Sequence, residues 1–219
     1  MAEHSQILER AATPGGELVL RRRGADFEII SNGTFLMDTR DGRSERLLVN
    51  AALDRCASPR PRVLIGGLGV GFSLTAAVCR AEASVIDVAE ISAEIIRWHG
   101  SHLRHLTASA RADPRVRVIH ADVAEWLASG AGRYDAICLD VDNGPHWLSR
   151  EANLPLYRDA GLRGLREALS PGGVLTVWSA AAVPDFGLLL GRHFTGVRAL
   201  RVPVRRGEPD VVYVAVASM

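Results

Sequence analysis

The sequence predicts an α/β protein in which a mostly parallel sheet of seven strands follows a small β unit. Three observations indicate this class. A short apolar run at 63–65 leads through a glycine turn into a helical segment, strand-like and helical segments alternate up to residue 194, and two apolar runs close the chain. Such alternation is typical of a parallel sheet with helices on both faces and right-handed crossovers.

Composition narrows the class of protein. A length of 219 residues suits one main domain with a small appendage, and a net charge of +1 favours neither a nucleic acid nor a membrane as partner. No apolar run reaches the roughly 18 residues of a membrane span. The first ten residues lack the apolar core of a signal peptide, so we expect a cytoplasmic protein. All 26 basic residues are arginine, which excludes Schiff-base chemistry and a P-loop lysine.

The chain divides into three predicted parts. Residues 1–16 have weak periodicity and are expected to form a leader, and residues 58–219 form the main domain. Between them, residues 17–57 contain short β-type runs around an Asn32-Gly33 hairpin signal, followed by a helix over 44–53. Because so small a β unit buries little surface by itself, we expect it to pack on the main domain or across a homodimer, and we favour the dimer.

In the main domain, the sequence predicts alternating strands and helices. After the glycine turn we expect a helix over 72–80, strands over 84–90, 115–120, 134–140 and 173–180, helices over 91–106, 123–129, 153–169 and 185–194, and an antiparallel pair over 196–204 and 210–218. In such a sheet, ligands bind at the carboxyl ends of the strands.

The glycine turn is the clearest functional motif. Its spacing is Gly67-x-Gly69-x-Gly71, without the glycine that would complete the dinucleotide fingerprint G-x-G-x-x-G. A G-x-G-x-G turn after a strand is typical of class I folds that bind S-adenosylmethionine (SAM). Glycines there permit a tight turn and a close approach of the backbone to the cofactor, beside the N-terminus of a helix.

Acids at the ends of the next two strands are candidate nucleoside-binding residues. Glu90 lies 19 positions after Gly71, where a carboxylate suits a bidentate bond to the two ribose hydroxyls. Its alternatives are a solvated helix cap for Glu90 and a ribose role for Asp87 instead. Asp122, after the third strand, can accept from the adenine amino group, and it is also a good N-cap for the helix that follows.

The loop after the fourth strand carries the candidate catalytic residues. Asp140 ends a buried strand and therefore emerges at the ligand edge, where it could orient an amine or deprotonate it for attack on a carbon attached to a sulfonium. The polar residues Asp142, Asn143 and His146 follow and are expected to line an acceptor pocket. The alternative is a loop that only caps the next helix.

Histidines and cysteines give no metal site in this sequence. His99, His102 and His105 could share one side of a helix, and we expect an exposed polar face because no further ligand can be placed. Cys56, Cys79 and Cys138 are isolated in apolar surroundings, and they are predicted to be buried rather than disulfide-bonded.

Taken together, these motifs resemble the spermidine synthase (polyamine aminopropyltransferase) family of class I SAM-dependent transferases. The resemblance runs from about residue 27 to residue 179 and rests on Val63–Gly71, Glu90-Ile91-Ser92, Asp122, Tyr134–Pro145 and Leu169–Ser179. It implies a Rossmann-like class I SAM-methyltransferase fold, an N-terminal β unit, and SAM or decarboxylated SAM as the donor.

Three departures from the family pattern concern the polyamine half of the site. Val70 stands where the family has an acid that contacts the aminopropyl donor. Ser44-Glu45-Arg46 replaces a Tyr-His-Glu stretch, and Asn143 stands where the catalytic loop has its second acid, the nearest acid being Asp142. We therefore expect this half of the site to lack the negative charge that holds a polycation.

These departures favour SAM-dependent methyl transfer to an unidentified small-molecule acceptor, slightly ahead of aminopropyl transfer from decarboxylated SAM to an amine. Both reactions need in-line positioning and at most one base, because the donor carries the reactivity. Two alternatives belong to other classes. One is a non-catalytic nucleoside-binding protein, and the other is an NAD-dependent oxidoreductase, which the glycine spacing disfavours.

Overall fold

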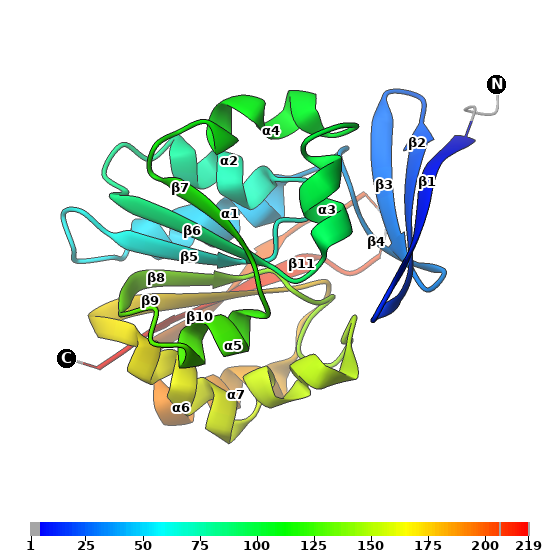
Figure 1. Cartoon of the computed structure of the whole chain (residues 1–219). Coiled ribbons are helices and arrows are strands. Elements are labelled where there is room, and N and C mark those ends of the chain that lie inside the picture. The colour runs from blue at the N-terminus through cyan, green and yellow to red at the C-terminus, as the bar shows by residue number, and fades with distance from the viewer. Residues whose placement is uncertain (1–4, 206, 219) are drawn as a thin grey trace. The chain divides into compact units, whose positions relative to one another are not determined.

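The computed structural model describes residues 5–205 and 207–218, and the chain divides into two compact units, residues 1–42 and 43–219 (Figure 1). The boundary precedes helix α1 (Arg43–Leu53), which was expected to belong to the small β unit. It belongs to the large unit because its apolar side, including Leu48, Val49 and Ala52, is fully buried against strands of the large sheet.

The small unit is a four-stranded antiparallel sheet in the order β1-β2-β3-β4. Its strands are β1 (Ser5–Thr13), β2 (Gly16–Arg23), β3 (Asp26–Ser31) and β4 (Thr34–Asp38). The turn between β3 and β4 has positive φ at both Asn32 and Gly33, so the predicted Asn-Gly hairpin is confirmed.

Strand β1 corrects the expectation of a leader over 1–16. It pairs with β2 from Ser5↔Arg23 to Thr13↔Gly16, with one irregularity between Ile7 and Glu9. Its side chains are exposed or half-buried, so as an edge strand it needs little apolar alternation and its sequence signal is weak. Residues 1–4 of the expected leader lie outside the described residues.

The large unit contains the predicted seven-stranded sheet, in the order β10-β11-β9-β8-β5-β6-β7. Strand β11 is antiparallel to both of its neighbours, and the other strands run parallel to one another. The strands are β5 (Arg62–Gly66), β6 (Val85–Glu90), β7 (Val116–His120), β8 (Tyr134–Leu139), β9 (Leu169–Ser179), β10 (Thr195–Val202) and β11 (Asp210–Val216).

Helices cover both faces of this sheet. One face contacts α1, α2 (Phe72–Val78) and α4 (Arg104–Arg111), and the other contacts α5 (Val123–Ala128), α6 (Asp159–Ala168) and α7 (Pro184–His193). Two predicted helices are interrupted. Residues 91–106 hold α3 (Ala93–Trp98) and the start of α4, and residues 153–169 hold the end of a 3-10 helix, η1 (Glu151–Tyr157), before α6. Pro155 lies within η1 and cannot donate a helical hydrogen bond.

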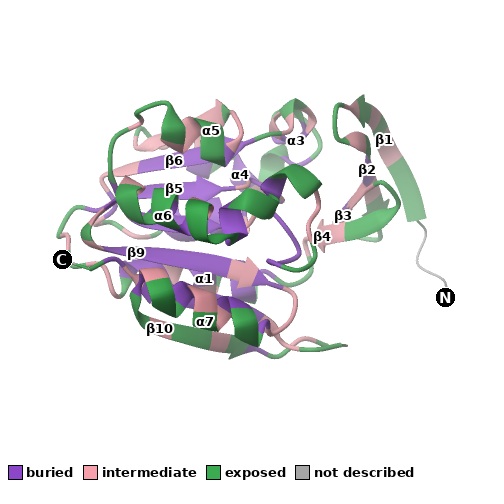
Figure 2. Ribbon diagram, turned by 90° about the horizontal axis from the view of Figure 1, so that it is seen from below, coloured by how far each residue is buried: buried purple, intermediate pink, exposed green. Residues whose placement is uncertain are grey.

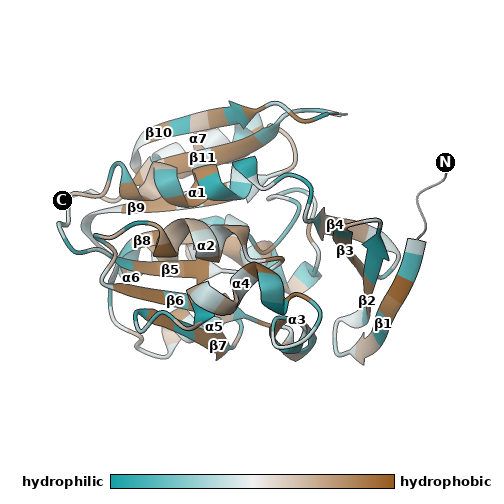
Figure 3. Cartoon of the chain, turned by 90° about the horizontal axis from the view of Figure 1, so that it is seen from above, coloured by the Kyte–Doolittle hydropathy of each residue, from teal (hydrophilic) through white to brown (hydrophobic). Residues whose placement is uncertain are grey.

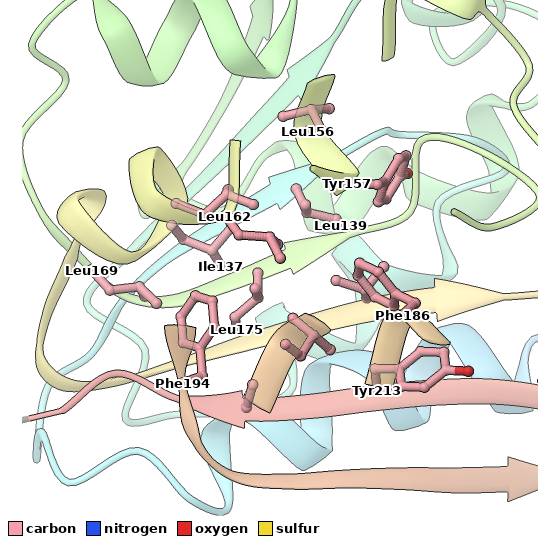
Figure 4. Close-up of a cluster of buried hydrophobic side chains, with 14 of the residues drawn as sticks. Ile137, Leu139, Leu156, Tyr157, Leu162, Leu169, Leu175, Phe186, Phe194 and Tyr213 are labelled. Carbon is pink, nitrogen blue, oxygen red and sulfur yellow. The ribbon is translucent and has the colours of Figure 1, made fainter. Parts of the chain in front are cut away.

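The apolar core lies on both faces of the central strands, which are almost entirely buried (Figure 2) and apolar (Figure 3). In the cluster of Figure 4, Ile137 and Leu139 of β8 lie against Leu162 of α6, and the Phe186 ring packs edge-on against Tyr213 at 5.3 Å between centroids. Truncating one such leucine to alanine costs about 2–5 kcal/mol of stability. This packed core therefore fixes the positions of the strand ends, from which the candidate site residues emerge.

The topology marks one edge of the sheet as the place for a ligand. From β5 the chain proceeds to β6 and β7 on one side, and it then returns to β8 and β9 on the other. A crevice forms outside the carboxyl ends of the strands where the strand order reverses. Here that point lies between Gly66 of β5 and Leu139 of β8, which are neighbours in the sheet.

Candidate active site

The glycine turn follows β5 and precedes a helix, as predicted, and it lies at the reversal point. The Gly71 N–H donates to the Leu68 carbonyl at 2.9 Å and closes a tight turn, in which Gly69 has a φ of +50°. Helix α2 starts immediately afterwards at Phe72. The chain thus changes from strand to helix within six residues, and a turn this tight needs glycine.

Two of these glycines are required by the protein itself. A Cβ at Gly67 would lie 2.2 Å from the Asp140 carbonyl oxygen, and a Cβ at Gly71 would lie 2.2 Å from the Thr107 methyl carbon. Both residues also have positive φ, +93° and +94°. Close internal packing therefore explains them without a ligand, an explanation that the motif alone does not reveal.

Glu90 lies at the end of β6 and holds the glycine turn. Its Oε2 accepts from the Leu68 N–H at 2.8 Å and its Oε1 from the Ser92 N–H at 2.7 Å, and the Gly69 N–H also donates to this carboxylate. Burial raises the pKa of Glu90, against the effect of these donors. The side chain is only 4% exposed, so the solvated-cap alternative is wrong.

Asp87, the alternative to Glu90, has a structural role. It is fully buried, its carboxylate forms a two-point ion pair with Arg117 at 2.7 Å, and it accepts from the Tyr134 hydroxyl at 2.8 Å. Asp122 follows β7 and caps α5, since it accepts from the Ala124 N–H at 2.8 Å. The predicted N-cap is thus confirmed, and an adenine contact by Asp122 stays a prediction.

Asp140 follows β8, and the charges of three other acids act on its carboxylate. Burial raises its pKa well above the usual value, and the negative charge of Glu45 raises it further, followed by those of Asp210 and Glu90. The Ser73 hydroxyl, 3.5 Å from Oδ2, opposes the rise. These acids come from α1, β6, β8 and β11, so elements far apart in the sequence place them together.

Glu45 and Asp210 share one hydroxyl group. The Ser44 Oγ lies 2.9 Å from the Glu45 Oε2 and 2.8 Å from the Asp210 Oδ2. A hydroxyl has one proton to donate, so it serves only one of these carboxylates at a time. Ser44 thus brings the two carboxylates near one another. Whether these acids belong to the polyamine half of the site, which was expected to lack acids, stays a prediction.

Asp142, which was predicted to line an acceptor pocket, is held by donors from the fold itself. Its carboxylate accepts from the Ser149 N–H at 2.6 Å, the Ser149 hydroxyl at 2.7 Å, the Asn153 amide at 3.0 Å and the Tyr157 hydroxyl at 2.9 Å. The side chain is buried, and its donors span residues 149–157. Asp142 therefore anchors the segment after β8 and has little capacity left for a ligand.

The other two predicted acceptor residues have different surroundings. Asn143 is buried, and its backbone carbonyl accepts from the Ala180 N–H at 2.9 Å, which ties the segment to the end of β9. His146 and the neighbouring Trp147 are both exposed. These observations do not bear on whether Asn143 and His146 line an acceptor site, so that role stays a prediction.

The three histidines do not share one exposed face. His102 and His105 are exposed. His99, which directly follows the end of α3 at Trp98, is instead fully buried beside the glycine turn. Among the described residues there is no group of three or more histidine, cysteine or acidic side chains placed to hold a metal ion. Of the cysteines, Cys138 is buried as predicted, whereas Cys79 is exposed.

A cavity of about 370 Å³ lies away from these acids, between α7, β10 and β11. Its lining includes Val211 and Tyr213, which alternate along β11 with Asp210 and Val212 and so face the opposite side of the sheet. The cavity is therefore separate from the candidate active site. In the described part of the chain, no helix is both long and apolar enough to cross a membrane.

Comparison with known proteins assigns the family. The spermine/spermidine synthase domain model matches residues 44–183, well over half of the 219 residues. The chain therefore belongs to the spermine/spermidine synthase family. The matched region contains the glycine turn, Glu90, Asp122 and the Asp140 loop, so the motifs identified in the sequence lie inside the family domain.

Relatives with curated names include enzymes of two kinds. The chain is 31% identical over 177 residues to a polyamine aminopropyltransferase of Corynebacterium efficiens, covering 77% of this chain and 32% of that protein. It is 29% identical over 130 residues to putrescine N-methyltransferase 1 of Nicotiana tabacum, covering 59% of this chain and 33% of that protein. The chain spans about a third of the length of the first curated relatives that it matches.

A solved structure confirms the fold. A spermidine synthase in complex with the transition-state analogue AdoDATO superposes with a TM-score of 0.80 at 17% identity, covering 97% of this chain and 74% of that chain. The α/β class and the Rossmann-like SAM-methyltransferase type of sheet are therefore as predicted.

Proposed function

We propose that this protein is an aminopropyltransferase, which transfers the aminopropyl group of decarboxylated SAM to an amine. The observation that carries the proposal is the group of acids formed by Glu45, Asp140 and Asp210. A partly buried cluster of carboxylates is stabilised by a cation, and an amine acceptor is a cation at neutral pH. The family supports the same reading, which was our alternative to methyl transfer.

Asp140 has the place and environment of the base. Its raised pKa brings it closer to neutral pH, where a general base works best. The acceptor amine, once deprotonated, forms a bond from its nitrogen to the propyl carbon attached to the sulfonium. The carbon–sulfur bond breaks, its electron pair stays on sulfur as the neutral thioether methylthioadenosine, and Asp140 receives the proton lost from nitrogen.

Glu45 and Asp210 take the role of electrostatic partners for the acceptor. Val70, which stands where the family has a donor-contacting acid, is buried and apolar, so it offers no charge. Glu45 reaches the site from the first turn of α1 and Asp210 from the start of β11. Both negative charges favour a bound ammonium group. We expect an acceptor with at least one amine beyond the reacting one.

The glycine turn and the acids after β6 and β7 are the proposed donor-binding residues. Gly67, Gly69 and Gly71 shape the turn, Glu90 faces the ribose and Asp122 the adenine. Glu90 already accepts three backbone N–H groups. A carboxylate offers about four lone-pair sites, so we expect it to bind one ribose hydroxyl instead of the two that the sequence suggested.

The test compares the two donors with the two products. Purified protein is titrated calorimetrically with SAM and with decarboxylated SAM, and it is then incubated with each donor and a series of diamines. We expect tighter binding of decarboxylated SAM, and release of methylthioadenosine together with an aminopropylated amine detected by mass spectrometry.

Two other results would indicate a different function. Release of S-adenosylhomocysteine from SAM would establish methyl transfer, the activity named for the Nicotiana tabacum relative. Binding of a donor without turnover of any amine would favour a non-catalytic nucleoside-binding protein. A matched control is Asp185→Asn, which changes an exposed acid on α7 and should leave both binding and turnover unchanged.

A further inference from the structure

His99 links two helical segments to the glycine turn. Its side chain is fully buried, its Nε2 lies 2.8 Å from the Gly69 carbonyl oxygen and its Nδ1 lies 2.7 Å from the Thr107 Oγ1. His99 follows α3, and Thr107 belongs to α4. A histidine that contacts the middle of the turn is unaccounted for by the transfer chemistry.

The hydrogen bonds determine which nitrogen of His99 carries the proton. The Gly69 carbonyl can only accept, so Nε2 must carry a hydrogen and donate it. In the neutral ring Nδ1 then accepts, and the Thr107 hydroxyl donates to it. Burial lowers the pKa of His99, which favours this neutral form. The Gly69 carbonyl thus selects the tautomer, and Thr107 holds the ring in place through Nδ1.

Thr107 also contacts the turn directly. A Cβ on Gly71 would lie 2.2 Å from the Thr107 methyl carbon and 3.3 Å from the His99 Cε1, so both side chains pack against this glycine. One residue therefore supplies two separable interactions. Its hydroxyl acts through His99 on Gly69, and its methyl group packs against Gly71.

The turn is consequently held from two directions. Glu90 accepts from the N–H groups of Leu68 and Gly69, and His99 donates to the Gly69 carbonyl. In a trans peptide the carbonyl and the next N–H point in opposite directions, so a fixed Gly69 carbonyl also fixes the orientation of the Val70 N–H. Glycine backbone samples many conformations when nothing restrains it.

We propose that His99, held in place by the Thr107 hydroxyl, is a positioning residue that presets the turn Leu68–Gly71 for the donor nucleoside. This inference rests on the proposed function for its ligand, but its restraint on the turn is a property of the free protein. Losing His99 should therefore loosen the turn without ligand, weaken donor binding and raise the donor KM. The kcat at saturating donor should change little.

The experiment uses two matched pairs of variants. Thr107→Val keeps the methyl packing and loses the hydroxyl, whereas Thr107→Ser keeps the hydroxyl and loses the methyl. His99→Met fills the space without a donor, and His99→Gln offers an amide N–H toward Gly69. Thermal unfolding of each variant establishes that it is folded before further measurement.

Two readouts are then taken. The first is amide hydrogen exchange of the peptide that covers 66–72 in the free protein, where we expect faster exchange in His99→Met and Thr107→Val. The second is the affinity for decarboxylated SAM, where we expect a loss of about ten-fold in His99→Met, the factor of one hydrogen bond, with partial recovery in His99→Gln.

The outcomes separate this inference from the proposed function. If Thr107→Ser loosens the turn and Thr107→Val does not, packing and not the hydrogen-bond relay holds it, and the proposal is overturned. Unchanged exchange in His99→Met overturns it as well, and so does faster exchange with unchanged donor affinity. A wild-type protein that binds neither SAM nor decarboxylated SAM overturns the proposed function and the donor role of His99 together, although the exchange data still test the restraint.

Discussion

Asp140 and Asp142 lie two residues apart in one loop, yet their surroundings are opposite. Asp142 is surrounded by hydrogen-bond donors from Ser149, Asn153 and Tyr157. Asp140 is surrounded by acids, and among the residues that the structure describes only the Ser73 hydroxyl, at 3.5 Å, is a donor to its carboxylate. The first carboxylate is satisfied within the fold, and the second is held in a state that a cation would relieve.

The difference shows how to tell a structural acid from a functional one. A buried carboxylate with every lone pair occupied stabilises its loop and has nothing left for a substrate. A carboxylate with a raised pKa and acidic neighbours costs the fold stability, and such sites cluster where chemistry occurs. Position in the loop does not separate the two; the surrounding donors and charges do.

Asp140→Asn should give the largest effect on activity. The variant keeps the shape of the side chain and removes the proton acceptor, so we expect kcat to fall by about 10²–10⁴-fold, the contribution of a positioned base. Steady-state kinetics with decarboxylated SAM and the best diamine give the value. Turnover at the wild-type rate would remove Asp140 from the mechanism.

Asp142→Asn should disrupt the hydrogen bonds that anchor the loop and should lower the stability of the protein. An asparagine oxygen accepts fewer bonds, and its NH₂ group would face the donors that now bind the carboxylate. We expect a loss of about 2–4 kcal/mol of unfolding free energy, as for other buried charged groups whose hydrogen bonds are lost. Urea unfolding measures it, with Asp185→Asn as the control. A variant as stable as the wild type would show that the anchor is dispensable.

Glu45→Gln should sharpen the comparison through the pH dependence of activity. Asp140 accepts a proton only when ionised, so activity falls as the pH decreases through its pKa. The negative charge of Glu45 raises that pKa. Its removal should therefore lower the pKa of Asp140 and move the acidic limb of the kcat/KM profile to lower pH, while the acceptor KM rises about ten-fold, the factor of one lost charge contact. A limb that stays in place or moves upward contradicts the assigned coupling.

Tyr157→Phe should give the smallest effect. It removes one of several donors to Asp142, the hydroxyl at 2.9 Å, and leaves the ring packed against Phe186 at 5.9 Å between centroids. We expect a loss of about 1 kcal/mol of stability and nearly unchanged kcat. Thermal unfolding and a rate assay on one preparation give both values. A large fall in kcat would instead place Tyr157 in the chemistry.

Local patterns predicted most of the fold. The alternation of strands and helices, the Asn32-Gly33 hairpin and the turn at Gly67–Gly71 are all visible in short stretches of sequence, and the structure has them. Strand β1 and the break after Trp98 were missed, because an edge strand and a helix end depend on pairing and burial that periodicity does not encode.

The site was predictable only where a residue follows a strand. Glu90, Asp122 and Asp140 each come directly at or after a strand end, so the sheet topology places them. Asp210 begins a strand at the far end of the chain and meets Glu45 only through the fold, 166 residues separating it from Ser44. His99 gave one signal, a histidine in the helical segment that follows Glu90, but its burial was not visible in the sequence.

The contact between Gly67 and the Asp140 carbonyl has a consequence for how this protein can diversify. With 2.2 Å available for a Cβ, no other residue fits at position 67 without displacing the start of the Asp140 loop. The proposed donor-binding turn and the proposed base are thus coupled through this contact, and a change in the backbone of one displaces the other. Under the proposed function, changes of acceptor preference therefore have to arise elsewhere, on α1 around Glu45 and at the start of β11.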